Sequence, residues 1–136
     1  MALPFDQINF FAVLVGGVIN MAVGFVWYGP LFGKLWLRLI GKTEEDIAGG
    51  PGLGYLWSFI AALVTALVLS LLIASMGSTT FAEGLLAGVL VAVGFVATTS
   101  LTSAIFDDKH LGVWLLFAGY QLVVLAIVGG MLAIWR

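Results

Sequence analysis

The sequence contains four apolar runs that are long enough to cross a bilayer and carry almost no charge. They cover residues 8–28, 53–74, 81–106 and 111–135. At about 1.5 Å per residue, a helix of even the shortest run would be roughly 30 Å long, the thickness of a bilayer core. Segments of this length satisfy their backbone hydrogen bonds in lipid as helices. The runs therefore predict an all-α membrane protein built as a four-transmembrane-helix bundle.

The composition supports this choice of solvent and excludes several classes of function. Of the 136 residues, 62% are hydrophobic and 9% are charged, whereas soluble domains contain about 25% charged residues. We expect a single integral membrane domain over residues 1–136, whose first run is retained because no basic residue precedes it. A net charge of −2 without a basic patch argues against nucleic-acid binding. The sequence has no cysteine and no HExxH, GxSxG, P-loop or GxGxxG motif, so we predict neither an enzyme nor a cofactor.

An aromatic corner follows the first run, where the first charges of the chain begin. Its side chains suit the boundary between membrane and water, because tryptophan and tyrosine prefer that layer and proline ends or bends a helix. In residues 30–42, basic and apolar residues recur at helical spacing, so that the basic residues share one face and the apolar residues the other. This pattern predicts a short interfacial helix with its apolar face in lipid. The corner residues are Trp27, Tyr28, Pro30, Lys34, Trp36 and Arg38.

Small residues recur at four-residue spacing along the runs and allow helices to approach closely. Because these ridges exceed what four helices need among themselves, we expect a homodimer. The turn at residues 76–80 is short enough to predict that the second and third spans pack as an antiparallel hairpin. The ridges are Ala12, Gly16, Asn20 and Gly24; Ala62, Ala66, Ser70 and Ala74; and Gly84 with Gly88.

The basic residues predict the orientation of the chain, because lysine and arginine in short loops stay on the cytoplasmic side. Four of the five lie in loops one and three, and only Arg136 lies on the other side. We therefore expect loops one and three in the cytoplasm and both termini outside. The sequence Ala-Val-Gly-Phe-Val occurs at residues 22–26 and again at 92–96, either as the trace of a duplicated hairpin or by chance in an apolar alphabet.

The corner also carries a family resemblance. The stretch from Trp27 to Lys34, then Trp36, then residues 41–47 (Gly-Lys-Thr-Glu-Glu-Asp-Ile) resembles a family of small bacterial four-span membrane proteins catalogued as domain of unknown function 1761. The resemblance covers nearly the whole chain. It implies a multi-pass protein of the bacterial inner (cytoplasmic) membrane, with membrane lipids as neighbours, and it supplies no reaction or substrate.

Four polar residues inside the spans are candidates for lining a cavity: Asn20, Thr98, Thr102 and Gln121. An unpaired amide is costly in hydrocarbon, so the two amides either bond to each other and join the first span to the fourth, or line a polar space. The hydroxyls either face that space or bond back to carbonyls of their own helix.

Two further places hold acidic groups. Asp107, Asp108 and His110 are weak candidates for a metal site, because consecutive residues rarely converge on one ion, and Asp108 is also a suitable cap for the fourth span. Glu83 lies one turn into the third span, where it either carries a proton or favours the helix N-terminus electrostatically. We predict no metal centre.

Two functions of different classes follow from these residues. In the first, the protein is a small transporter or channel-like protein, and its polar residues meet in a cavity between spans. In the second, it is a non-transporting lipid-binding or scaffold protein that acts through the corner at residues 27–42. The first requires the four polar residues to face a common space, and the second requires a closed core.

Overall fold

The computed structural model describes residues 2–136 and is built from helices, with no strand among those residues. A short turn, η1 (Phe5–Gln7), precedes the bundle. The helical elements that follow are α1 (Phe10–Val26), η2 (Trp27–Leu31), α2 (Gly33–Ile40), α3 (Glu44–Ile47), α4 (Leu53–Ser75), α5 (Phe81–Val91), η3 (Ala92–Ala97), α6 (Thr98–Phe106) and α7 (Leu111–Ile134).

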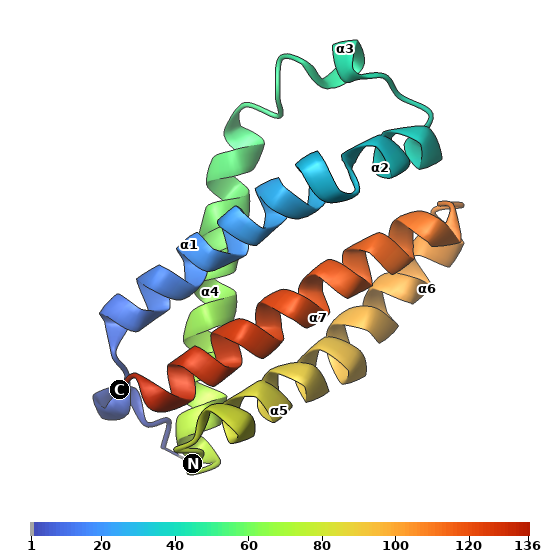
Figure 1. The fold of residues 1–136 in the computed structure, drawn as a ribbon. Coiled ribbons are helices and arrows are strands. Elements are labelled where there is room, and N and C mark those ends of the chain that lie inside the picture. Colours follow the sequence, from blue (N-terminus) through green and yellow to red (C-terminus); the bar gives the residue numbers. More distant parts are fainter. Residues whose placement is uncertain (1) are drawn as a thin grey trace.

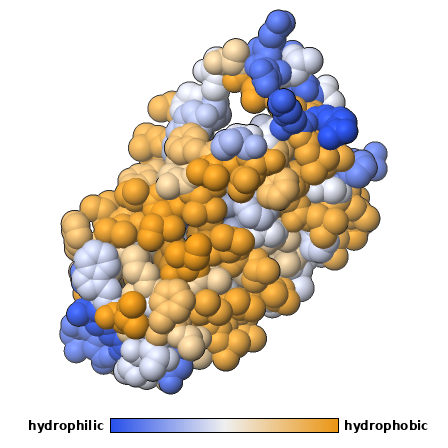
Figure 2. All heavy atoms as spheres, viewed as in Figure 1, coloured by the Kyte–Doolittle hydropathy of each residue, from blue (hydrophilic) through white to orange (hydrophobic). Residues whose placement is uncertain are grey.

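Four continuous helices are long and apolar enough to cross a membrane, and this confirms the predicted four-span architecture. They cover Phe10–Leu31, Leu53–Ser75, Phe81–Phe106 and Leu111–Ile134. The second, third and fourth match the predicted runs to within one residue. The first starts two residues later than predicted, because the Asn9 side chain accepts hydrogen bonds from the next turn and caps the helix there. Figure 2 shows a hydrophobic belt between hydrophilic ends, as a bilayer requires.

The fourth span, α7, is the central helix of the bundle. It packs against α1, α4, α5 and α6, and α1 packs in addition along α4 (Figure 1). The predicted hairpin of the second and third spans is wrong: α4 and α5 meet at their connecting turn and then diverge, and α5 pairs with α7 instead. The most deeply buried side chains therefore come from α4 and α7, and they include Leu69, Ile73, Val124, Leu125 and Leu132.

The predicted small-residue ridges are used inside the chain. A side chain on Gly16 would lie 3.1 Å from the Ala66 Cβ, so the first two ridges face each other between α1 and α4. A side chain on Gly84 or Gly88 would collide with the backbone of α7, so this pair sets the close contact between α5 and α7. The ridges thus account for the packing within one chain.

Two spans contain a wide, π-helical segment, at the end of the first span and near the middle of the third. In the first span this segment is η2, which contains Pro30, and in the third span it is η3. The prediction that the first helix stops or turns near Tyr28 is therefore corrected, because the wider turn accommodates a proline without ending the helix before Leu31. The repeated pentapeptide precedes η2 in one span and coincides with η3 in the other.

The interfacial helix predicted over residues 30–42 is α2, and its surroundings differ from the prediction. Its buried residues, Gly33 and Leu37, lie against the bundle, and Leu39 reaches Gly112 in the first turn of α7. Lys34 and Arg38 are exposed as expected. The helix ends at Gly41, which adopts φ 72°. Because α2 continues from α1 and packs on α7, part of its apolar face contacts protein rather than lipid (Figure 1).

Residues 41–52 form an arch from the end of α2 to the start of α4 (Figure 1). At its middle, Thr43 and Asp46 form the capping box of α3 that their spacing predicts. Glu83 forms an equivalent box with Thr80 at the start of α5, which agrees with its expected place at a helix N-terminus.

Candidate functional site

Trp27 fixes the corner to the bundle. Its indole Nε1–H donates a hydrogen bond to the carbonyl oxygen of Leu116 in α7, at 3.0 Å. Its ring lies 4.8 Å from that of Phe32 and close to Gly119, where a side chain would lie only 3.1 Å from the indole. Trp27 therefore acts as an anchor between the first and fourth spans, in addition to the interfacial role that its residue type predicts.

The second glycine of the corner is required by a close backbone contact. A Cβ on Gly33 would lie 2.7 Å from the carbonyl oxygen of Tyr28, whereas a Cβ on Gly29 would meet nothing within 4 Å. The backbone is thus tightly packed where η2 passes into α2. This contact positions Trp36 over Tyr28, with ring centroids 5.3 Å apart and planes at 66°.

A cavity of about 720 Å³ lies beneath the arch, between α1, α4 and α7. Figure 2 shows a hollow at this place, with hydrophilic atoms above it and hydrophobic atoms below. We call it the corner cavity. Its volume falls within the range of small-molecule sites. It is lined by Met21, Gly24, Phe25, Tyr28, Gly29, Trp36, Lys42, Asp46, Ile47, Gly50, Pro51, Tyr55, Ser58 and Tyr120.

Aromatic rings form much of its wall, and all three tyrosines of the chain take part. The ring of Tyr28 stands at 66° to that of Trp36 and at 69° to that of Tyr120, whose centroid is 5.7 Å away. On the other side, the rings of Phe25 and Tyr55 are 5.6 Å apart. Tyr28 therefore connects the ring of Trp36 to that of Tyr120 in the wall of the cavity.

The rim of the cavity carries one charge of each sign, Lys42 and Asp46. The backbone N–H and the hydroxyl of Thr43 donate hydrogen bonds to Asp46 Oδ2 at 2.8 and 3.1 Å. These bonds, with a smaller contribution from the Lys42 charge, hold the pKa of Asp46 below its ordinary value. Asp46 is thus ionised at neutral pH.

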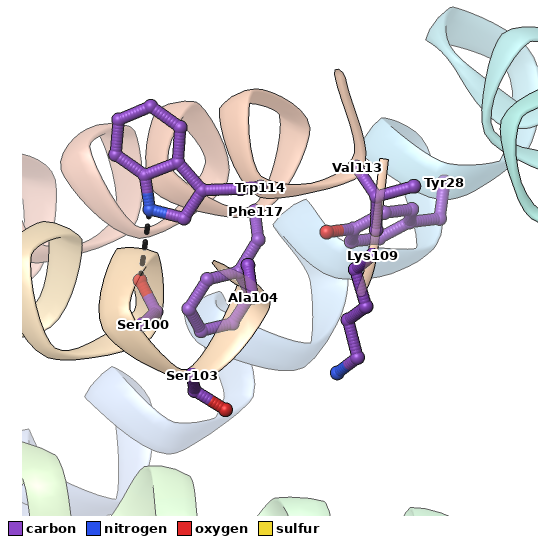
Figure 3. Close-up of a pocket in the computed structure, with 8 residues that line it drawn as sticks. All are labelled: Tyr28, Ser100, Ser103, Ala104, Lys109, Val113, Trp114 and Phe117. Atoms are coloured by element: carbon purple, nitrogen blue, oxygen red, sulfur yellow. Dashed lines mark hydrogen bonds between the residues drawn. The ribbon is translucent and has the colours of Figure 1, made fainter. Parts of the chain in front are cut away.

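A smaller cavity of about 300 Å³ lies on the far side of Tyr28, between α6 and α7. Figure 3 shows the Tyr28 hydroxyl directed into this space, and Lys109 at its edge. The Trp114 Nε1–H donates to the carbonyl oxygen of Ala97 at 2.9 Å and lies 3.2 Å from Ser100 Oγ. Tyr28 lines both cavities and separates them.

The two amides singled out from the sequence do not bond to each other. The hydroxyl of Tyr120 lies 2.8 Å from the carbonyl oxygen of Asn20 and also contacts its side-chain Oδ1. Asn20 does form a hydrogen bond between the first span and the fourth, but its partner in the fourth span is Tyr120 and not Gln121. Gln121 is partly buried and lines neither of the two cavities.

The hydroxyls of the third span also stay away from a common space. Thr98 and Thr102 are exposed on the outside of α6, and each donates to a carbonyl four residues earlier, Gly94 and Thr98 respectively. This is the local alternative of the two that the sequence left open. Asn20, Thr98, Thr102 and Gln121 are therefore not brought together around either cavity.

The polar side chains of the acidic loop, residues 107–110, contact nearby residues of the chain. Ser103 Oγ lies 3.1 Å from Asp107 Oδ2, and His110 Nδ1 accepts the backbone N–H of Gly112. His110 is thus the cap of α7 that was expected of Asp108, which instead adopts φ 55° in the turn. Within residues 2–136 no group of three or more His, Cys, Asp or Glu side chains is placed to hold a metal ion.

Sequence reasoning found the corner and missed most of the cavity beside it. Tyr28 and Trp36 were identified, but as interfacial anchors. Tyr55, at the start of the second span, indicates only the same interfacial role, and Tyr120 was missed because an aromatic residue in an apolar run has no local pattern that distinguishes lipid contact from a cavity wall. The signal that could have marked Asp46 and Lys42 was the capping box itself, since it predicts an ordered connection.

The chain belongs to the family described as "Protein of unknown function (DUF1761)", whose profile matches residues 11–133. The match spans all four helices and both cavities. No curated protein and no solved structure matches the chain.

Proposed function

We propose that the chain is a non-transporting binding protein of the bacterial cytoplasmic membrane and that the corner cavity is its binding site for an amphipathic ligand. The observation that carries this proposal is the cavity itself. About 720 Å³ of space combines an aromatic wall, a floor from the first span and two opposite charges at the rim. Sites for small ligands have this composition: apolar walls with a few placed polar groups.

The polar groups inside the spans support binding over transport. A transport path requires polar groups to line a continuous space, yet the hydroxyl of Tyr120 contacts Asn20 and the hydroxyls of α6 contact their own backbone. Of the twelve charged residues, only Glu83 lies within a span, and there it caps the first turn of α5. Nothing on these helices supplies the mid-membrane charge that proton-coupled transporters use.

Orientation and assembly extend the proposal. The excess of basic residues in loops one and three favours an orientation with the arch and the corner cavity on the cytoplasmic side and both termini outside. The outward face of the third span, with Gly94, Thr98 and Thr102 four residues apart and exposed, is the small-residue surface that is free for a second copy. We infer a homodimer through this face.

The test is native mass spectrometry of the full chain released from lipid nanodiscs, with one cavity-filling variant and one matched control. Ser58 and Ala61 are both exposed on α4, and only Ser58 lines the corner cavity. Wild type and Ala61→Phe should retain one tightly held amphipathic molecule per chain, and Ser58→Phe should lose it. The same spectra report whether the chain is a dimer.

Equal retention by Ser58→Phe would contradict the proposal, because a ring at this position takes up part of the cavity and should weaken the hold on a ligand there. Far-UV circular dichroism and the unfolding midpoint of Ser58→Phe should match those of Ala61→Phe. A protein that carries no adduct in any variant would also contradict it.

A further inference from the structure

The corner cavity presents separate partners for a positive and a negative group, which a site for amphiphiles in general would not require. We propose that it binds a zwitterionic headgroup, with an ammonium held by the aromatic rings and the Asp46 carboxylate, and an anionic group such as a phosphate held by Lys42. This inference rests on the proposed binding function and names the chemistry of its ligand.

The aromatic walls provide the first half of the argument. A cation is attracted to the face of an aromatic ring, and pockets of several rings recognise ammonium groups. Tyr28 makes edge-to-face contacts with both Trp36 and Tyr120, so three connected rings line one side of the cavity. A purely apolar ligand would be served equally well by leucine or valine, yet five of the fourteen lining residues are aromatic.

The two charges at the rim provide the second half. Both hydrogen bonds from Thr43 to the Asp46 carboxylate, from the backbone N–H and from the hydroxyl, end on Oδ2, so Oδ1 is left for a ligand. Lys42 lines the same cavity. A ligand with only a cation would be repelled by Lys42, and one with only an anion would be repelled by Asp46. A zwitterion has a favourable partner for each of its charges.

The position of the cavity indicates where such a headgroup comes from. Its floor includes Met21, Gly24 and Phe25 of the first span, and its rim is the water-exposed arch. Phe25 lines the cavity, belongs to the first span and is 56% exposed, so acyl chains next to it could remain in lipid. Phosphatidylethanolamine and free phosphoethanolamine share the headgroup chemistry, and the experiment separates them.

The experiment uses the full chain in nanodiscs made from equal amounts of phosphatidylethanolamine and phosphatidylglycerol with the same acyl chains. Native mass spectrometry then measures the ratio of the two lipids retained. Wild type should favour phosphatidylethanolamine. Asp46→Asn and Lys42→Gln should each lower the ratio about three- to fivefold, the effect of losing one exposed charge contact.

Each matched control has the same net charge as the variant with which it is compared, and it leaves the residues that line the cavity unchanged. Glu44→Gln changes the same helix as Asp46, and Lys34→Gln changes an exposed lysine of α2, and neither residue lines the cavity. Both should retain the wild-type ratio. Trp36→Leu should lower it, whereas Trp57→Leu should not, because Trp57 is 65% exposed and lies outside the cavity.

A second arm adds phosphoethanolamine to detergent-solubilised protein and follows tryptophan fluorescence. A response that Asp46→Asn abolishes supports the inference and shows that the headgroup alone suffices. Lipid preference without this response supports it with the lipid as the source. Equal retention of both lipids, unchanged by Asp46→Asn, would overturn the inference while the Ser58→Phe result upholds the proposed function. Loss of every adduct in wild type would overturn both.

Discussion

Replacing Gly33 with alanine tests whether the corner is held by a backbone contact or only by its aromatic side chains. The Cβ of an alanine at this position would lie 2.7 Å from the carbonyl oxygen of Tyr28, and ordinary contacts begin at 3.4 Å. The corner must therefore open by about 0.7 Å, the difference between these distances. The opposing atom belongs to the backbone of η2, so it cannot rotate away as a side chain could.

The expected cost can be set against a control in the same motif. Inserting a methyl group into a tight contact costs about 1–3 kcal/mol. Alanine in place of glycine in a helical conformation otherwise stabilises by about 0.5–1 kcal/mol. A Cβ on Gly29 would meet nothing within 4 Å beyond its chain neighbours, but Pro30 disfavours a Cβ on the helical residue before it, so Gly29→Ala should lose part of this gain. Gly33→Ala should still be the less stable of the two variants, by up to about 3 kcal/mol.

The assay is reversible unfolding in mixed micelles by titration with sodium dodecyl sulfate, followed by far-UV circular dichroism. Native mass spectrometry should add that Gly33→Ala holds its ligand more weakly, because Tyr28 and Trp36 shift apart. Equal stability of the two variants, or a greater loss in Gly29→Ala, would refute the argument from backbone contact.

Three further outcomes follow from the hydrogen bonds. Tyr120→Phe should lower the free energy of unfolding by about 0.6–2 kcal/mol in the same titration, because it leaves Asn20 without its interhelical partner; an unchanged midpoint would refute this. Thr98→Val and Thr102→Val should each change it by less than about 0.5 kcal/mol, since their hydroxyls contact only their own helix. Because hydrogen bonding depresses the pKa of Asp46, its contribution to the arch is present above the ordinary value of 3.8 and is lost as pH falls through the folded pKa. As the pH is lowered, the amide exchange rate of residues 43–47 should therefore rise relative to that of a helix start without a cap. A ratio of the two rates that does not change with pH would contradict a role of ionised Asp46 as the cap.

The spans were predictable because hydropathy reports the solvent of each segment directly. Three of the four match the prediction to within one residue, and the capping box of Thr43 and Asp46 follows from their spacing. The pairing of the helices was not predictable in this way. Every span carries small residues at similar spacing, so α5 has equally good local reasons to pack on α4 as on α7.

The site shows the same division between local and distant causes. The aromatic corner is contiguous in sequence, and its residue types mark it. The way the corner packs on the bundle depends on two contacts between residues about ninety positions apart. Leu116 accepts a hydrogen bond from Trp27, and the ring of Tyr120 lies beside that of Tyr28. The wide turn of η2 likewise needs this anchoring, since Pro30 alone indicates a break and does not specify its form.

The connections between the spans differ in length, and the difference bears on function. Five residues join the second span to the third and four join the third to the fourth, whereas 21 residues separate Leu31 from Leu53. Helix connections in bundles need about two to eight residues, and longer ordered ones are typically functional. The extra length forms α2, which packs on α7, and the arch, which supplies Lys42 and Asp46 to the corner cavity. Crossing the membrane requires neither, so the longest connection of the chain, which carries six of its twelve charged residues, is best explained by the cavity that it covers.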